Sequence, residues 1–419
     1  MKLKIIATAL CLSISTLLNA QTPNAPVLTL AQAHQQPLLD TLKQICSIES
    51  GSREIEGLNQ VANVVAERLR AQGGNVEILS ANTDVYKMED TPDELGKMVK
   101  ATWRGTGTKK IAMIAHMDTV YPKGMLARQP FRIEGNQAFG LGIADDKQGV
   151  AMIMHVVAML REMKFDQFGK LTVLINGDEE ISSPGSRAAL IQLGIDHDVV
   201  MSFEGSRVNS DKLALATAGI ASVNLNVTGR ASHSGGAPEN GINALYELSH
   251  QILQTRDLSD TKLGIKMNWT ISKAGVTRNM IPPFASASAD VRVLRVEDYD
   301  EIERKIRERI KTQLLPNAKV ELTFERRRPP LEANEAGKKL AAMSQEIYKE
   351  LGKTLVVDAV ADGGGTDAAF AALKTKGAVV ERYGLRGFGA HTTDAEYVLV
   401  DSIVPRLYLA TRVVMEASK

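Results

Sequence analysis

Strand-like apolar runs alternate with helix-like stretches over the first half of this 419-residue chain, up to about residue 217. Strands separated by helices pair in parallel, because each helix carries the chain back across the sheet. The alternation predicts an α/β fold with a mostly parallel sheet and helices on both faces. The strand-like runs are 110–116, 170–175 and 198–203, and the helix-like stretches are 54–72, 147–164 and 185–193.

The pattern changes between residues 218 and 328. There the order is strand, helix, strand, strand, helix, strand, which is the order of an α+β ferredoxin-like unit. Beyond Pro329 the α/β pattern resumes, so the unit is predicted to be an insertion into the larger domain, with strand edges or helices that can pair two subunits. Its expected segments are 221–229, 239–256, 265–273, 285–294, 297–314 and 318–326, and the later helices are 334–351, 366–374 and 400–416.

Residues 1–20 have the pattern of a secretory signal peptide. Lys2 and Lys4 precede an apolar run from Ile5 to Leu18, and Ala20 is a small residue at the expected cleavage position. The apolar run is too short to span a bilayer comfortably, and no later stretch is long enough. We therefore expect an exported protein, periplasmic and without a membrane anchor.

The charge balance argues against a polyanionic partner. The chain has 50 basic and 49 acidic residues, and the signal segment removes two lysines and no acids. Without a basic excess, neither nucleic acid nor an anionic membrane is an expected partner. Of the two cysteines, Cys11 lies in the signal segment, so Cys46 is expected to be a small buried residue rather than half of an internal disulfide.

Acidic and imidazole side chains recur where strand-like runs end or in glycine-rich turns. In open α/β sheets, sites form at the carboxyl ends of the strands. His116 and Asp118 are two apart in extended chain, so they face the same way, and the aspartate can orient the imidazole. The motifs are His116-Met117-Asp118, Ala144-Asp145-Asp146-Lys147, Asp178-Glu179-Glu180, Ser202-Phe203-Glu204 and Gly389-Ala390-His391.

These residue types suit a pair of metal ions. Asp145 and Asp146 repel each other unless a cation offsets their charge, and a carboxylate such as Asp145 can bridge two metals. Glu180 is a candidate ligand, and Glu179 a candidate base that takes a proton from water and returns it to the leaving nitrogen. Taken singly, each motif is equally typical of a solvated strand end. Together they predict a two-metal centre for hydrolysis.

Other polar residues are candidates for contacts with a substrate. The imidazole of His233, after the first strand of the inserted unit, can donate to a developing oxyanion. Arg292 and Arg328 carry planar guanidinium groups that bind carboxylates. The loop Gly363-Gly364-Gly365-Thr366-Asp367 precedes a predicted helix and can offer backbone N–H groups to an anion. Each of these residues also fits an ordinary loop or capping position.

Taken together, these motifs resemble the dizinc aminoacylase and carboxypeptidase family of metallopeptidases. The likeness covers nearly all of the chain after the signal segment. It is strongest to the bacterial glutamate carboxypeptidases of that family, which hydrolyse folates. The stretches 116–121, 363–369 and 395–398 carry this closer likeness, whereas Gln148 stands where the family is expected to have a glycine.

The resemblance implies a zinc-peptidase-like fold, with residues 21–217 and 329–419 as the catalytic domain and 218–328 as a dimerisation or lid domain. It also implies two Zn²⁺ per subunit and a homodimer. Asp145 would bridge the metals, with His116 and Glu204 completing one site and Glu180 and His391 the other. Asp118 would orient His116, Glu179 would be the general base, and His233 would reach the site of the partner subunit. Residues that would hold a C-terminal glutamate are Arg292, Asn279, Arg328, Lys212, Gly364, Gly365 and Thr366.

The sequence therefore predicts an exported zinc carboxypeptidase that releases glutamate from folate, methotrexate or related N-acyl glutamates. An N-acyl-amino-acid deacylase or a dipeptidase would use the same metal site. An exported anion-binding protein without catalytic activity is the alternative from another class, but such a protein has no use for a general base like Glu179.

Overall fold

The structure is a computed structural model, and it describes residues 22–419. The predicted signal peptide, residues 1–20, lies outside the described residues. Within residues 22–419, no helix is both long enough and apolar enough to cross a membrane. Cys46 is buried, as expected from the sequence.

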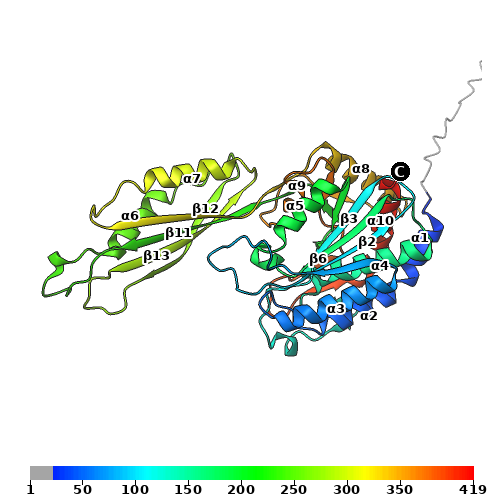
Figure 1. Ribbon diagram of the computed structural model, residues 1–419, viewed down its shortest axis with the longest axis horizontal. Coiled ribbons are helices and arrows are strands. Elements are labelled where there is room, and N and C mark those ends of the chain that lie inside the picture. Colours follow the sequence, from blue (N-terminus) through cyan, green and yellow to red (C-terminus); the bar gives the residue numbers. More distant parts are fainter. Residues whose placement is uncertain (1–21) are drawn as a thin grey trace, which may run out of the picture.

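A six-stranded sheet forms the centre of the larger part of the molecule (Figure 1). The four strands that end in β17 run parallel to one another, and only β2 is antiparallel to its neighbours. The mostly parallel sheet predicted from the sequence is confirmed. In spatial order its strands are β1 (Asn75–Leu79), β2 (Met98–Arg104), β6 (Lys170–Asn176), β3 (Lys110–His116), β7 (Val199–Ser202) and β17 (Ala378–Val380).

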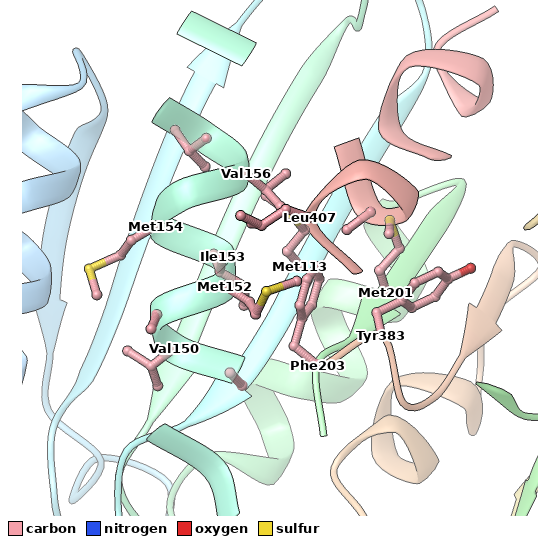
Figure 2. Close-up of a cluster of buried hydrophobic side chains, with 14 of the residues drawn as sticks. Met113, Val150, Met152, Ile153, Met154, Val156, Met201, Phe203, Tyr383 and Leu407 are labelled. Atoms are coloured by element: carbon pink, nitrogen blue, oxygen red, sulfur yellow. The ribbon is translucent and has the colours of Figure 1, made fainter. Parts of the chain in front are cut away.

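Helices cover both faces of this sheet, because alternate residues of each central strand point to opposite faces. In β3, Met113 belongs to the core beneath the larger helical layer, whereas Ile114 belongs to the core on the other face. Figure 2 shows Met113 and Met201 of the sheet facing Ile153 and Leu407. The first layer contains α1 (Ala25–Ala33), α2 (Gln35–Cys46), α3 (Ile55–Ala71), α4 (Gln148–Glu162), α8 (Glu335–Lys349) and α10 (Ile403–Ala417), and the second contains α5 (Arg187–Asp196) and α9 (Ala368–Ala372).

A second sheet of short strands lies beside the carboxyl edge of the main sheet and supports the loops of the site. Its edge strand β8 pairs in parallel with β18, and its other pairs are antiparallel. Strands this short leave little periodicity to detect, and none of them was predicted. They are β4 (Arg132–Glu134), β5 (Gln137–Phe139), β19 (Tyr397–Leu399), β18 (Arg386–Phe388) and β8 (Ser206–Arg207).

Residues 219–328 form a lobe at the opposite end of the molecule (Figure 1). Its elements follow one another along the chain in the ferredoxin-like order expected from the sequence, and its four-stranded antiparallel sheet has the spatial order β12-β13-β11-β14. Burial alternates along β13, so one sheet face packs on the two helices. The elements are β11 (Gly219–Thr228), α6 (Ala244–Thr255), β12 (Lys266–Ala274), β13 (Phe284–Val293), α7 (Asp298–Arg309) and β14 (Lys319–Arg328).

The chain leaves and re-enters the larger part through adjacent strands. β10 (Ala216–Thr217) pairs in an antiparallel way with β15 (Leu331–Glu332), so the two connections lie side by side. Next to them, β9 (Lys212–Ala214) pairs in parallel with β16 (Val356–Asp358).

Candidate metal centre and active site

The five predicted metal ligands lie together at the carboxyl edge of the main sheet. His116 ends β3, while Glu180 and Glu204 follow its two neighbours, β6 and β7. Because parallel strands end at the same edge, side chains from three separate stretches of sequence meet there. Asp145 and His391 come from loops that pack against this edge.

Asp145 lies between two imidazole rings. Its Oδ1 is 3.1 Å from Nε2 of His116, and its Oδ2 is 3.2 Å from Nε2 of His391. Each imidazole has a second acidic neighbour, since His116 is 3.4 Å from Glu204 and His391 is 3.2 Å from Glu180. One carboxylate thus faces two separate groups of nitrogen and oxygen atoms, which is the arrangement expected of a bridging ligand.

The residues present fit a pair of divalent metal ions. Among the described residues, potential ligand atoms converge in two groups, each within 4.8 Å: His116, Asp146 and Glu204, and Asp145, Glu180 and His391. Imidazole nitrogen with carboxylate oxygen is a donor set that suits zinc. Oε1 of Glu180 is buried and has no hydrogen-bond partner among the described residues, so it is available to a ligand.

The electrostatics of the cluster also favour a cation. Burial and then the charge of Asp145 raise the pKa of Glu180 to about 8. Burial and then Glu204 raise the pKa of Asp146 well above its ordinary value. Contacts with Asp145 and Glu180 raise the pKa of His391 to about 11. Buried carboxylates this close together resist ionisation, and a divalent cation would stabilise their charged forms.

Asp146 differs from Asp145 in its surroundings. It is fully buried, and its carboxylate accepts a hydrogen bond of 2.6 Å from the amide of Gln148. The same side chain of Gln148 donates to the carbonyl oxygen of Phe203 at 2.8 Å and accepts from the N–H of Leu385. Gln148, noted above as a departure from the family pattern, therefore joins the loop of Asp146 to the strand end that carries Glu204.

Asp118 is placed to orient His116. Its Oδ1 lies 3.3 Å from Nδ1 of the imidazole, whose other nitrogen faces Asp145. The carboxylate also accepts hydrogen bonds of 3.0 Å from the backbone N–H groups of Glu179 and Glu180. One buried side chain thus sets both the direction of an imidazole and the position of the acidic turn.

Glu179 lies beside the cluster and forms an ion pair with Arg328. Its Oε1 is 2.7 Å from Nη1 of Arg328, which is also 3.1 Å from Asp367. The guanidinium donates a further hydrogen bond of 2.6 Å to the carbonyl oxygen of Glu179. Arg328 was predicted to hold a substrate carboxylate. With only 3% of its side chain exposed, it is instead engaged by two acids of the protein itself.

A cavity of about 930 Å³ opens over the metal cluster. Its wall includes the predicted substrate-binding residues Arg292, Arg328, Gly364, Gly365 and Thr366. A Cβ atom on Gly365 would lie 2.7 Å from the side chain of Arg328, so this position requires glycine. The helix after the loop, α9, has only five residues, so what the loop offers an anion is its own N–H groups rather than a helix terminus.

The other predicted residues do not line this cavity. His233 and Asn279 are exposed in loops of the lobe, and Nδ1 of His233 accepts hydrogen bonds from Gly235 and Gly236. Lys212 forms an ion pair of 3.0 Å with Asp358. Within the described chain, these three side chains are therefore separate from the metal cluster.

Glu396 is an important residue that the sequence analysis missed. Its buried carboxylate accepts hydrogen bonds from the N–H groups of Gly142 (3.2 Å), Ala144 (2.7 Å) and Asp145 (3.1 Å), and from the hydroxyl of Tyr121 (2.7 Å). It therefore fixes the loop that carries the bridging candidate. The only signal in the sequence was its position in the stretch 395–398, where the family likeness is close.

The fold and the site together define a metal-dependent hydrolase. Residues 112–416 match the family described as "Peptidase family M20/M25/M40", and the chain belongs to this family. Carboxypeptidase G2 of Pseudomonas sp. (strain RS-16) is 42% identical over 391 residues, covering 93% of this chain and 92% of that protein. The chain is accordingly a metallo-carboxypeptidase.

More distant proteins share parts of the sequence or the fold. N-acetyl-L-citrulline deacetylase of Xanthomonas campestris is 26% identical over 242 residues, covering 55% of this chain and 63% of that protein. A metallo-carboxypeptidase of the M20 family from Sulfolobus solfataricus has the same fold, with a TM-score of 0.72 at 16% identity, over 91% of this chain and 99% of that one.

Proposed function

We propose that this enzyme hydrolyses the amide bond to a C-terminal glutamate, in substrates such as folate, methotrexate and related N-acyl glutamates. The observation that carries the reaction type is the placement of Asp145 between His116 and His391, with Glu179 beside them. The similarity to Carboxypeptidase G2 and the motif resemblance described above support the choice of substrate.

In this proposal two Zn²⁺ ions would bind in the cluster. His116 and Glu204 would hold one ion, Glu180 and His391 would hold the other, and Asp145 would be shared between them. When bound, zinc lowers the pKa of water to about 7 and polarises a carbonyl group.

Glu179 is the proposed proton carrier. It accepts a proton from the attacking water and donates it to the nitrogen that leaves as the amino group of glutamate. Burial raises the pKa of this carboxyl group well above its ordinary value, while the charge of Arg328 opposes the rise. A carboxylate with a raised pKa is a better proton acceptor, and Arg328 keeps it in a defined position. The hydrogen bond from the N–H of Glu179 to Asp118 fixes the same turn.

Substrate binding in this proposal involves a second subunit. Arg292 and the loop of Gly364, Gly365 and Thr366 bind the main-chain carboxylate of the glutamate. His233 and Asn279 lie outside the cavity of their own chain, so we assign them to the site of the partner subunit in a homodimer, where His233 stabilises the oxyanion. Lys212 stays a weaker candidate, because it does not line the cavity and forms an ion pair with Asp358. Export to the periplasm is part of the same proposal.

The test is hydrolysis of methotrexate and folate, followed by absorbance, with zinc content measured for each sample. We expect turnover by the wild type and a loss of about 10²–10⁴-fold in Glu179→Gln with both zinc ions retained. Glu346→Gln, on the exposed surface of α8, is the matched control and should keep full activity.

Other outcomes would identify a different function. Cleavage of N-acyl amino acids or dipeptides, without cleavage of glutamyl substrates, would identify a deacylase or dipeptidase with the same metal site. No cleavage by a fully zinc-loaded protein would favour the anion-binding alternative.

A further inference from the structure

Two arginines in the cavity wall share one carboxylate. Nη2 of Arg382 is 2.9 Å from Oδ2 of Asp362, and Nη2 of Arg207 pairs with the same oxygen atom. Both arginines line the cavity that contains the metal cluster. The side chain of Arg382 is 12% exposed, whereas that of Arg207 is 54% exposed. Arg207 is therefore accessible to solvent, and Arg382 is largely enclosed by the protein.

The backbone that carries this pair is held in place by two further arginines. The guanidinium of Arg406 is fully buried and donates to the carbonyl oxygen of Gly384 at 2.7 Å and to that of Arg382. Arg386 donates to the carbonyl oxygen of Val208, next to Arg207. Arg382 has a φ of 74°, a backbone conformation uncommon outside glycine, which this buried network stabilises.

The pair has fewer acidic partners per arginine than the other arginines of the cavity wall. Among the described residues of the wall, Arg292 has its own partner in Asp290 at 2.8 Å, and Arg327 has Asp90 at 2.7 Å. Arg328 has two acidic partners. Arg207 and Arg382 have only Asp362 between them, so an anionic group would complete the arrangement.

The pair lies next to the proposed position of the substrate's main-chain carboxylate. Asp362 directly precedes the glycine loop, and the carbonyl oxygen of Gly363 accepts a hydrogen bond of 3.1 Å from Arg292. Arg292 and the pair of Arg207 and Arg382 thus contact adjacent residues at the start of this loop, Gly363 and Asp362. A residue bound at this loop would bring a side-chain carboxylate close to the pair.

We infer that Arg207 and Arg382 bind a second carboxylate of the released residue, which makes the enzyme selective for a C-terminal residue with an acidic side chain. This inference rests on the proposed function and specifies how the same site distinguishes glutamate from glutamine. Planar guanidinium groups bind carboxylates through paired hydrogen bonds, and a neutral amide of the same shape cannot make the same charge-assisted contacts.

The test compares N-benzoyl-L-glutamate with N-benzoyl-L-glutamine, which differ in this charge but hardly in shape. We expect kcat/KM for the glutamate substrate to fall about ten- to hundredfold in the double variant Arg207→Gln/Arg382→Gln, with little change for the glutamine substrate. Arg207→Gln alone changes an exposed side chain that the fold tolerates, and should give part of the effect. Arg304→Gln, an exposed arginine of α7, is the control and should change neither value.

Binding of glutarate, measured by calorimetry on the zinc-loaded enzyme, separates this inference from the proposed function. If the variants release glutamate with the wild-type preference over glutamine, the inference is wrong and the proposed function stands. If the wild type cleaves neither substrate, the proposed function is wrong. In that second case, weaker glutarate binding by the double variant would still support an anion site at Arg207 and Arg382, and unchanged binding would overturn it.

Discussion

Carboxylates at this site act in two different ways, although they are chemically alike. Asp145 presents both oxygens to imidazole rings and is available to metal. Glu396, which directly precedes β19 and contacts the loop of Asp145, presents both oxygens to donors of the protein and is thereby fully engaged. The position of the Asp145 carboxylate therefore depends on Glu396, because Glu396 accepts a hydrogen bond from the backbone N–H of Asp145.

Glu396→Gln is therefore predicted to weaken zinc binding. An amide has one acceptor oxygen, so its NH₂ group would face backbone N–H donors and loosen the Asp145 loop. We expect the zinc affinity to fall about 10- to 100-fold, and activity to recover at saturating zinc. A zinc titration against a chelating indicator measures this, with Glu335→Gln on the exposed start of α8 as control. An unchanged affinity would show that the loop holds its shape without the carboxylate.

At the scale of elements, the positions of helices depend on buried polar contacts as well as apolar packing. His197 follows α5 and ties it to the sheet: Nδ1 contacts the carbonyl oxygen of Leu193 at 2.8 Å, and Nε2 contacts the hydroxyl of Thr172 in β6 at 2.8 Å. Burial lowers the pKa of this imidazole to about 4. The native helix–sheet contact is therefore made by a neutral ring.

This lowered pKa predicts a loss of stability in mild acid. Below pH about 6.5 the unfolded chain protonates His197, whereas the folded protein does so only near pH 4. The stability contribution is thus fully present above pH 6.5 and is lost as pH falls between these values, by about 1.4 kcal/mol per pH unit. Urea unfolding at pH 7 and pH 5 measures it, and His197→Gln should show a smaller difference than wild type. Equal differences in the two proteins would contradict the assignment.

At the scale of the whole molecule, the lobe of residues 219–328 exposes apolar side chains away from the metal centre. On α6, the side chains of Leu245, Tyr246 and Leu253 are 42%, 61% and 57% exposed. Apolar side chains grouped on a surface in this way are typical of contacts between proteins. This supports the proposal that the lobe pairs two subunits and brings His233 of the partner subunit to each cavity.

Tyr246→Asp combined with Leu253→Asp is predicted to give monomers with little activity. The introduced charges oppose burial at the interface, and a monomer lacks the imidazole that we assign to the oxyanion. Light scattering after size exclusion measures the mass, and kcat measures the activity. Lys319→Glu on β14, the opposite edge of the lobe's sheet, is the control and should leave both unchanged. A fully active monomer would refute the role given to His233.

Sequence periodicity was sufficient for most of the longer elements. Helices α3, α4, α8 and α10 and strands β3, β6 and β7 lie where it predicted them, and so do all six elements of the lobe. β1 is a short, half-exposed strand whose apolar pattern is weak, and it was missed along with β2 and the small sheet beside the site. Helices α1 and α2 and the short strand β17 were missed as well. The motif residues at strand ends were identifiable, because the chemistry of a metal pair restricts the residue types.

The sequence by itself determined the fold class, the order of the elements and the residue types available for a metal pair, because these depend on local periodicity and on side-chain chemistry. Only the tertiary structure decided which side chains meet at the site. Arg328 pairs with Glu179, Glu396 holds the loop of Asp145, and Arg207 shares Asp362 with Arg382. Contacts of this kind join residues far apart in the chain. Their geometry follows from strand order and helix packing, which a local sequence pattern does not reveal.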